Sequence, residues 1–487
     1  MNSTHRPRKL IFKALGTFLL LPTLLAGCSS SVDAPGSGAG PQVERPSHTI
    51  RVLLDAADEP AQIAEEFGAE VLVWHGFDDA GSAEPGEPGA QPFALLAVDA
   101  APGAFSAGSE LEPCPDSDDP SPELRACIEV NDREFQAGAE RAEVWPDHLA
   151  KMDGEGRSTI WNEGRSTIWN EGRSTIWNEG GEFSWQPENT ELWQRLELEM
   201  AHNVTLADRL GAGVMVAVID TGVDLLHPNL QSALAPRELW LDLVDGDRTP
   251  QEEGEYDRYA SRAYGHGTNV AGIIRQVAPA ATILPIRVLQ PDGRGYTSDL
   301  VLAIEHAVQS GADIINLSLG SSDRSEAVSQ VIARAAEQGV FIVTAAGNSG
   351  GPVAFPANEA EDVMRPGHSY RLTVTSVDET DVKSAFAAHG MPVGLAAPGE
   401  LIWGPAPEEM FAAWTGTSMA APMASGALAL ALAEGDARLA VDRAGLLEAL
   451  SNSGADLYEG INGEYSVWSE LGRSRLDFWR FLNSVLE

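Results

Sequence analysis

Three polar side chains in the C-terminal half of the chain have the chemistry of acyl transfer. Asp220 ends the apolar run VMVAVID, His266 stands between two glycines in YGHGTNVAG, and Ser418 lies in GTSMAAPMASG at the threshold of an apolar helix. Acyl transfer needs a nucleophile, a base that takes its proton, and an acid that orients the base. The three residues therefore predict a serine, histidine and aspartate hydrolytic centre.

Ser418 taken alone has a simpler interpretation. Serine is a favoured helix N-cap, because its oxygen accepts from the first unpaired N–H groups of a helix. The same helix start would also present an N–H group to an oxyanion. Asn348, in TAAGNSGG after an apolar strand, could donate its amide to that oxyanion. The joint presence of the four residues favours catalysis over capping.

The elements that must position these residues form a regular pattern. From residue 190 to residue 487, continuous apolar runs alternate with amphipathic helical patterns. Such a pattern predicts an α/β fold with a parallel sheet covered by helices on both faces, whose ligands bind at the carboxyl ends of the strands. The predicted strands are VMVAVID, ATILPIRVL, ADIINLSL, VFIVTAA and YRLTVTSV, and the predicted helices are TNVAGIIRQV, LVLAIEHAVQSG and EAVSQVIARAAEQG.

These motifs, in this order, resemble the subtilisin-like serine proteases, the subtilases of peptidase family S8. The resemblance rests on AVIDTGVDLLHPNL, GHGTNVAG, the TAAGNSGG stretch and GTSMAAPMASG. It implies the subtilisin-like fold and serine endopeptidase activity on protein or peptide substrates. It also implies Ser418 as nucleophile, His266 as general base, Asp220 as the group that orients His266, and Asn348 as the oxyanion donor.

The resemblance also implies where a substrate binds. An extended substrate would pair with an edge strand formed by Leu317, Ser318, Leu319 and Gly320. Ala345, Ala346 and Gly347, with residues 355–357, would wall the first specificity pocket, for which we expect a broad or apolar preference. We expect no required cofactor and no metal site. Calcium in the acidic stretch LDLVDGDRTPQEEGEYD stays possible, but a solvated acidic loop is favoured.

The N-terminus has the pattern of a secretory signal. A basic start and an apolar stretch precede LLAGC. The apolar stretch is too short to span a membrane, and the whole segment resembles the signal of bacterial lipoproteins. We expect a signal peptide over 1–27, lipid on Cys28, and a flexible tether over 28–48. Ser29 after the cysteine favours the outer membrane. The alternative is an ordinary signal peptide with a chance cysteine.

Residues 49–150 predict a small α+β domain, from strands TIRVLL, EVLVWHGF and FALLAVDA and the helix EPAQIAEEFGA. Its position resembles that of an inhibitor-like subtilase propeptide. Outside the cytoplasm, Cys114 and Cys127 are expected to form a disulfide. Residues 151–189 contain GRSTIWNE three times. We interpret them as a duplicated linker that marks a domain boundary and the region of maturation cleavage. The alternative is a tryptophan-based adhesion element.

The charge balance limits the partners. With 72 acidic against 32 basic residues, the formal net charge is −40, which excludes nucleic acid as a partner because phosphate binding needs a basic face. The function predicted is an exported serine endopeptidase of the cell envelope, made as a lipid-anchored zymogen whose catalytic domain, 190–487, can be released. The alternative is a lipid-anchored binding or adhesion protein on an inactive protease scaffold.

Overall fold

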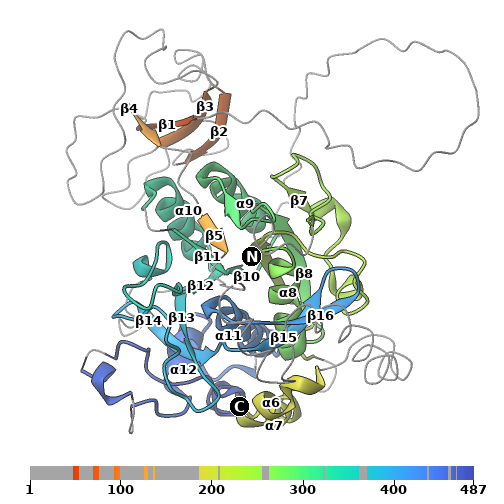
Figure 1. Cartoon of the computed structure of the whole chain (residues 1–487), viewed down its shortest axis with the longest axis vertical. Helices are drawn as coiled ribbons and strands as arrows, with labels where there is room; N and C mark the ends of the chain where they lie inside the picture. Colours follow the sequence, from red (N-terminus) through yellow and green to blue (C-terminus); the bar gives the residue numbers. More distant parts are fainter. Residues whose placement is uncertain are drawn as a thin grey trace, which may run out of the picture. The chain divides into compact units, whose positions relative to one another are not determined.

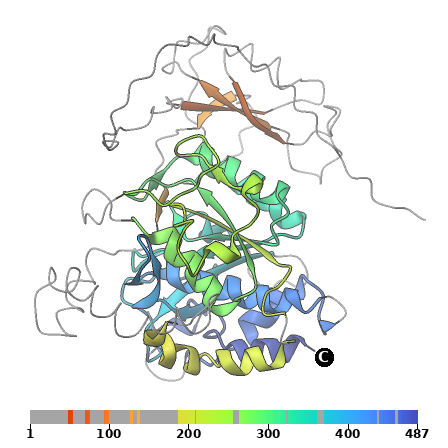
Figure 2. The same ribbon diagram turned by 90° about the vertical axis from the view of Figure 1, so that its right-hand side faces the viewer.

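The computed structural model describes residues 186–486, apart from 207–208, 255–262, 322–323, 361–369, 436–437, 459–461 and 468, and five short strands nearer the N-terminus (Figures 1 and 2). Several predictions lie outside the described residues: the signal peptide, Cys28, the tether, the helix at 59–69, Cys114 and the GRSTIWNE repeats. The domain boundaries, lipidation and disulfide therefore stay predictions. Within the described ranges, no helix is both long enough and apolar enough to cross a membrane.

A seven-stranded sheet carries the functional residues. Its order is β14-β13-β12-β10-β6-β8-β7, and every neighbouring pair is parallel. This confirms the predicted α/β class. The strands are β6 (Met215–Asp220), β7 (Leu241–Asp242), β8 (Thr282–Arg287), β10 (Ile314–Leu317), β12 (Phe341–Ala345), β13 (Arg371–Val377) and β14 (Val393–Pro398).

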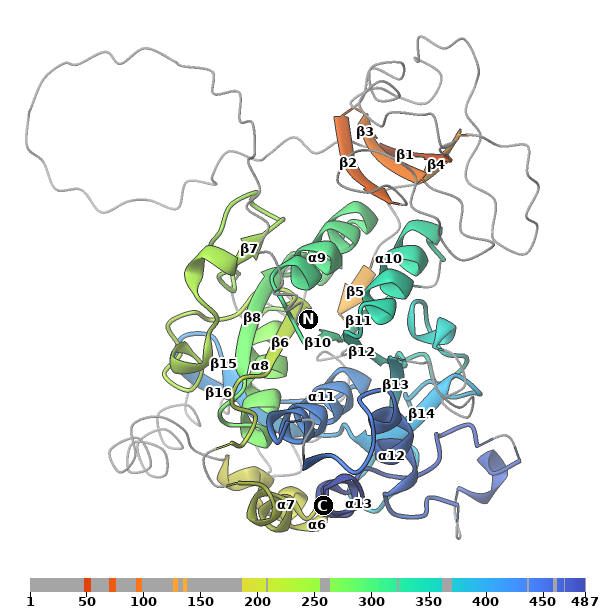
Figure 3. The same ribbon diagram turned by 180° about the vertical axis from the view of Figure 1, so that it is seen from behind.

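Both faces of the sheet are covered by helices, which explains why its strands are apolar throughout. In β6, Val216 and Val218 face one core, and Ala217 and Ile219 face the other. The first core contains α8 (His266–Val277) and α11 (Thr417–Ala433). The second contains α9 (Thr297–Gln309) and α10 (Glu326–Glu337). Figure 3 shows the helices and the sheet from the opposite side.

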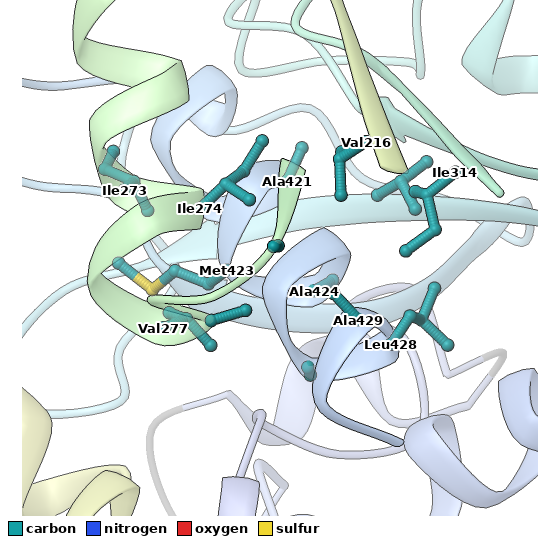
Figure 4. Packing of buried hydrophobic residues seen from close by; sticks show 14 of the residues in the cluster. Val216, Ile273, Ile274, Val277, Ile314, Ala421, Met423, Ala424, Leu428 and Ala429 are labelled. Atoms are coloured by element: carbon teal, nitrogen blue, oxygen red, sulfur yellow. The ribbon is translucent and has the colours of Figure 1, made fainter. Parts of the chain in front are cut away.

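The contact between α8 and α11 is close because small residues lie in it (Figure 4). Every residue of α11 is buried, as expected for a helix that is apolar on all sides. A Cβ added at Gly426 would lie 2.6 Å from the Cβ of Val277. Gly426 therefore lets α11 approach α8, although glycine inside a helix is otherwise destabilising.

The sequence pattern missed several elements. The structure adds β14 and an antiparallel hairpin of β15 (Ile402–Ala406) and β16 (Met410–Trp414). Strand ADIINLSL divides into β10 and the separate β11 (Leu319–Gly320). Within the described ranges there are also the helices α6 (Thr190–Arg195), α7 (Leu198–Val204), α12 (Gly445–Asn452) and α13 (Phe478–Val485). The Asp477 carboxylate caps α13 by accepting from the Arg480 N–H.

The N-terminal strands form a sheet of their own, in the order β2-β3-β1-β4, with antiparallel pairs. Strands β1 (His48–Leu53), β2 (Glu70–His75) and β3 (Phe93–Val98) match the three that the pattern predicted, and β4 (Ala126–Glu129) was not predicted. A further strand, β5 (Phe135–Ala137), lies between β11 and β9 (Arg294–Gly295) and is antiparallel to both.

Candidate active site

The site forms where three neighbouring parallel strands end. β6 ends at Asp220, β10 ends just before Ser318, and β12 ends at Ala345, three residues before Asn348. Because β12, β10 and β6 are adjacent and parallel, these ends share one edge of the sheet. This is the edge at which parallel sheets bind ligands.

Asp220 and His266 form a buried pair. His266 Nδ1 lies 2.7 Å from Asp220 Oδ1, and both residues have 0% exposure. Asp220 Oδ1 also accepts from the backbone N–H of Thr221 at 2.7 Å and from its hydroxyl at 3.2 Å. The Thr221 hydroxyl in turn accepts from the Gly267 N–H at 3.0 Å. Thr221 therefore links the strand end to the first turn of α8.

The two glycines beside His266 are both required by the backbone. Gly265 has φ +91°, in the left-handed region that favours glycine, and precedes the first residue of α8. A Cβ at Gly267 would lie 2.1 Å from the Gly222 carbonyl oxygen and 3.0 Å from the Asp220 Cβ. The first distance shows directly why the residue after His266 has no side chain, because a backbone oxygen cannot move away as a flexible side chain can.

Ser418 is the second residue of α11, not its N-cap. Gly416 precedes the helix, and the Ser418 hydroxyl donates to the Ser318 carbonyl at 3.1 Å. The capping interpretation is therefore wrong, because a cap accepts from a helix N–H instead. His266 Nε2 is buried and has no hydrogen-bond partner within the part of the chain that the structure describes. In resting enzymes, the bond between nucleophile and base is often long or misaligned.

A proline explains how Ser418 is held. Pro422 lies inside α11 and has no N–H, so the carbonyl of Ser418, four residues earlier, lacks its usual helical donor. The Ser318 hydroxyl donates to this carbonyl instead, at 2.9 Å. Ser318 in turn accepts from the Asn316 amide at 3.0 Å, and Asn316 accepts from the Ser425 hydroxyl at 2.9 Å. This buried network joins α11 to the end of β10.

Asn348 lies beside the same helix start. Its Oδ1 accepts from the Thr417 N–H and from the Thr417 hydroxyl, both at 3.0 Å. The Thr417 hydroxyl also accepts from the Gly347 N–H at 3.1 Å. Asn348 is thus fixed through its oxygen to the residue that precedes Ser418. The predicted oxyanion donor and the predicted nucleophile are brought together by one threonine.

The residues predicted to bind substrate also lie together. Leu319 and Gly320 form β11, and the N–H and carbonyl of Ser321 exchange hydrogen bonds with those of Phe355 at 2.8 and 3.0 Å. The Ala354 N–H donates to the Ala346 carbonyl at 2.9 Å. The two predicted pocket walls are therefore joined by backbone bonds. One small apolar cluster lies here: Ala346, Val353, Ala357, Ala388 and Val393.

Glu252 is a residue whose position the sequence did not reveal. It is 3% exposed, and its Oε2 accepts from the Thr268 N–H at 3.1 Å and the Thr268 hydroxyl at 2.8 Å. Burial raises the pKa of Glu252 to about 7. In the sequence Glu252 lies fourteen residues before α8, and only the fold brings its carboxylate to the first turn of that helix, where the dipole favours negative charge.

The acidic loop is solvated only in part: the Asp245 and Glu253 side chains are 48% and 55% exposed, whereas Asp242 is buried. Asp242 is fully buried and pairs with Arg287, 2% exposed, at 3.0 Å. Asp245 and Glu253 approach the same guanidinium at 2.6 and 3.3 Å. Burial raises the pKa of Asp242. Within the described ranges, no group of three or more histidine, cysteine or acidic side chains is arranged to hold a metal ion. Three of this loop's carboxylates are instead bound to an arginine.

Comparison with known proteins agrees with this geometry. The model of the subtilase family, peptidase S8, matches residues 211–455. The chain is 35% identical to thermitase of Thermoactinomyces vulgaris over 46% of this chain and 77% of that protein, and 33% identical to subtilisin BL of Lederbergia lenta over 48% and 81%. A solved structure titled a cold adapted subtilisin-like serine proteinase aligns with a TM-score of 0.42 and 30% sequence identity. The alignment covers 50% of this chain and 83% of that structure's chain. On the family match and the two relatives, this chain belongs to the subtilase family and is a serine-type endopeptidase.

Proposed function

We propose that the chain cleaves peptide bonds through an acyl-enzyme on Ser418, with His266 as base, Asp220 as its orienting acid and Asn348 as oxyanion donor. The observation that carries the proposal is the buried bond of 2.7 Å between His266 Nδ1 and Asp220 Oδ1. With Nδ1–H engaged by the carboxylate, the proton-accepting nitrogen is Nε2.

The reaction follows from these positions. His266 Nε2 takes the Ser418 proton while Ser418 Oγ attacks the substrate carbonyl carbon. The oxyanion is stabilised by N–H groups at the start of α11 and by the Asn348 amide. Collapse breaks the C–N bond, and His266 gives its proton to the leaving amine. Water then hydrolyses the acyl-enzyme in the same way. Asp220 stays ionised throughout and stabilises the imidazolium.

The substrate would bind as an extended strand beside β11. Support comes from the antiparallel pairing that Leu319 and Gly320 already make with another strand, β5. The small side chains around Ala346 support a broad or apolar preference at the first specificity pocket. No cofactor is required in this reaction. The proposed partners are proteins or peptides and the chain's own N-terminal domain, with nucleic acid excluded by charge.

The precursor is proposed to be exported and held at the cell envelope by lipid on Cys28, with the outer membrane favoured. The basic start, the apolar stretch and LLAGC support this placement. The anchor would lie on the N-terminal side of any maturation cleavage. Cleavage would therefore free the catalytic domain from its covalent tether, while the fragment that bears Cys28 stays on the membrane.

Casein hydrolysis by the wild-type chain and by Ser418→Ala, His266→Ala and Asp220→Asn variants tests the catalytic proposal. We expect each substitution to lower kcat by at least about 10⁴-fold, because the three residues act as one unit. Substituting Ser349, whose hydroxyl donates to the Pro352 carbonyl, with alanine provides a matched control that keeps activity. A wild-type chain that binds protein without hydrolysing it would favour the inactive-scaffold alternative.

A further inference from the structure

We propose that Ala354 restricts the first specificity pocket to small side chains, so that the enzyme cleaves after alanine, glycine or serine and rejects large apolar and aromatic residues at that position. The inference rests on the proposed role of Ser418. It narrows the proposed preference to small residues, and it gives a specificity-determining role to a residue that lies just outside both predicted pocket walls.

Two glycines beside the nucleophile show where this substrate side chain must lie. Gly347 precedes Asn348, which is bonded to the residue before Ser418. Gly320 lies two residues after Ser318, whose carbonyl accepts from the Ser418 hydroxyl at 3.1 Å. Because both glycines are so close to the attacking group, the side chain next to the attacked carbonyl has to enter between them.

The surface between the two glycines is formed by small residues. Gly320, Gly347 and Ala354 are all partly exposed. The side chains next to them in the sequence, Leu319 and Phe355, are buried. A substrate side chain that enters here therefore meets two glycine backbones and one methyl group.

The Ala354 methyl lies where the two glycine walls converge. A Cβ added at Gly347 would be 3.0 Å from the Ala354 Cβ, and a Cβ added at Gly320 would be 3.4 Å from the same atom. Carbon atoms in contact are about 3.5–4.0 Å apart. The methyl therefore fills the space in front of both glycines, and only a short substrate side chain fits above it.

The methyl is held in this position by the backbone. The Ala354 N–H donates to the Ala346 carbonyl at 2.9 Å, and the Ala354 carbonyl accepts from the Asn358 N–H at 2.9 Å. The next residue, Phe355, exchanges two backbone hydrogen bonds with Ser321. A long substrate side chain could therefore enter only by disrupting these bonds. One methylene in such a pocket changes the discrimination between substrates by about 10- to 200-fold.

The residues around the methyl favour an apolar side chain over a charged one. They form the small apolar cluster described above, of alanines and valines: Ala346, Val353, Ala357, Ala388 and Val393. A charged substrate side chain would lose its hydration against this surface. Small size and low polarity together indicate alanine as the best residue before the cleaved bond.

The test compares peptide p-nitroanilides that differ only in the residue before the cleaved bond, which is alanine, leucine or phenylalanine. We expect the wild-type chain to have at least about a tenfold higher kcat/KM for the alanine substrate than for the phenylalanine substrate. Ala354→Gly removes the methyl, so it should raise kcat/KM for the phenylalanine substrate at least about tenfold and leave the alanine substrate nearly unchanged.

A matched control separates the pocket from the general effect of a new glycine. Ala455 is also partly exposed and exchanges two backbone hydrogen bonds of 2.9 Å with Arg475. Ala455→Gly should leave the ratio of the two kcat/KM values unchanged. Ala354→Val should act in the opposite direction from Ala354→Gly and lower kcat/KM for the alanine substrate, because its larger side chain fills the remaining space.

Cleavage of a natural protein gives a second measurement. Mass spectrometry of casein digests identifies the residue before each cleaved bond. We expect alanine, glycine and serine before most of the bonds that the wild-type chain cleaves, and additional bonds after leucine and phenylalanine in digests by Ala354→Gly.

The outcomes distinguish this proposal from the catalytic one. A wild-type chain that cleaves after phenylalanine as fast as after alanine, or an Ala354→Gly chain with an unchanged ratio of kcat/KM values, would overturn the role of Ala354 and leave the catalytic proposal intact. A folded chain that hydrolyses neither casein nor any of the peptides would contradict the catalytic proposal, and the present inference with it.

Discussion

At the scale of single residues, the site depends on the close approach of the first turn of α8 to the end of β6. Gly267 lies where a Cβ would meet the Gly222 carbonyl oxygen at 2.1 Å. Its N–H also donates to the Thr221 hydroxyl, which bonds Asp220. The absence of a side chain at Gly267, together with its hydrogen bond to Thr221, thus sets the distance between Asp220 and His266.

Gly267→Ala should therefore move His266 away from Asp220. We expect kcat/KM on a peptide substrate to fall at least about 100-fold, since a displacement near 1 Å has that effect on positioned groups. Gly463→Ala is the control, because its added Cβ would have Tyr458 O as its nearest neighbour, at 3.8 Å. If kcat/KM were undiminished in Gly267→Ala, the start of α8 would accept the added Cβ without moving His266 away from Asp220.

Glu252 adds a pH dependence to stability. Its pKa in the folded chain is raised by burial from 4.5 to about 7. Folding therefore favours the protonated form. Its contribution to the free energy of unfolding is fully present below pH 4.5 and is lost as pH rises towards 7. The loss over this window is about 3 kcal/mol.

Glu252→Gln should remove this dependence, because glutamine keeps an acceptor for Thr268 and does not titrate. In the Ser418→Ala background, which prevents self-digestion, urea unfolding is measured from about pH 4.5 to about pH 8. We expect the variant to gain stability relative to its parent as pH rises. If the difference in free energy of unfolding between the variant and its parent did not change with pH, Glu252 would titrate at an ordinary pKa.

Sequence predicted the residue types of the site better than their bonds. Asp220, His266, Ser418 and Asn348 could be named because each follows or precedes a recognisable element. The donation from Ser418 to Ser318 could not, because it joins residues 100 positions apart. The burial of Glu252 was missed for the same reason: Thr268, which bonds it, lies in another element.

At the scale of elements, α11 is held to β10 by an exchange of hydrogen-bond partners. Pro422 deprives the Ser418 carbonyl of a helical donor, and Ser318 supplies the replacement. The missing helical hydrogen bond is thus replaced by a fixed contact between the start of α11 and the end of β10.

A double-mutant cycle measures this exchange. Ser318→Ala should cost about 1–3 kcal/mol, because it leaves a buried carbonyl without its donor. Pro422→Ala restores an N–H four residues after Ser418, so it should stabilise the Ser318→Ala chain more than the parent chain. Urea unfolding of the four chains in the Ser418→Ala background gives the coupling free energy between positions 318 and 422. If Pro422→Ala changed the free energy of unfolding equally in both chains, the Ser318 hydroxyl would not be replacing the missing helical donor.

Elements were predictable where they were apolar and periodic. All five strands predicted in the catalytic domain are present, and α8 begins one turn or less before its predicted start, at His266. Strands β14 and β15 were missed because their runs contain Gly and Pro, which usually mark turns. Tertiary packing overrides that signal: Pro405 lies against Gly272 of α8, where an added Cβ would be 2.0 Å from the proline ring.

At the scale of the whole molecule, the excess of acidic residues is the dominant physical feature. The net charge of −40 is carried by 72 acidic and 32 basic residues in 487. Like charges repel more strongly in the compact state than in the unfolded chain. Asp242, Asp245 and Glu253 relieve this locally by bonding Arg287, but one buried arginine does not balance the excess.

Salt should therefore stabilise the chain. Raising NaCl from about 10 mM to about 0.3 M shortens the screening length and weakens the repulsion, so the Tm of the Ser418→Ala chain should rise. Sodium and potassium chloride should act alike if screening is the cause. A Tm that falls or stays level would indicate that attractive ion pairs outweigh the repulsion.

Fold class was predictable from the alternation of apolar strands and helices over residues 190–487, whereas the pairing of β5 was not. Three residues, Phe-Gln-Ala, carry no periodicity, and their partners lie more than 150 positions further along the chain. Only the assembled sheet edge creates the place that β5 fills.

The most direct test of the catalytic account is covalent capture of the nucleophile. The wild-type chain is treated with a fluorophosphonate and analysed by peptide mass mapping. We predict one adduct, on Ser418, absent in Ser418→Ala and formed at least about 10³-fold more slowly in His266→Ala. An adduct on another serine, or none in a folded chain, would contradict the assignment of Ser418 as nucleophile.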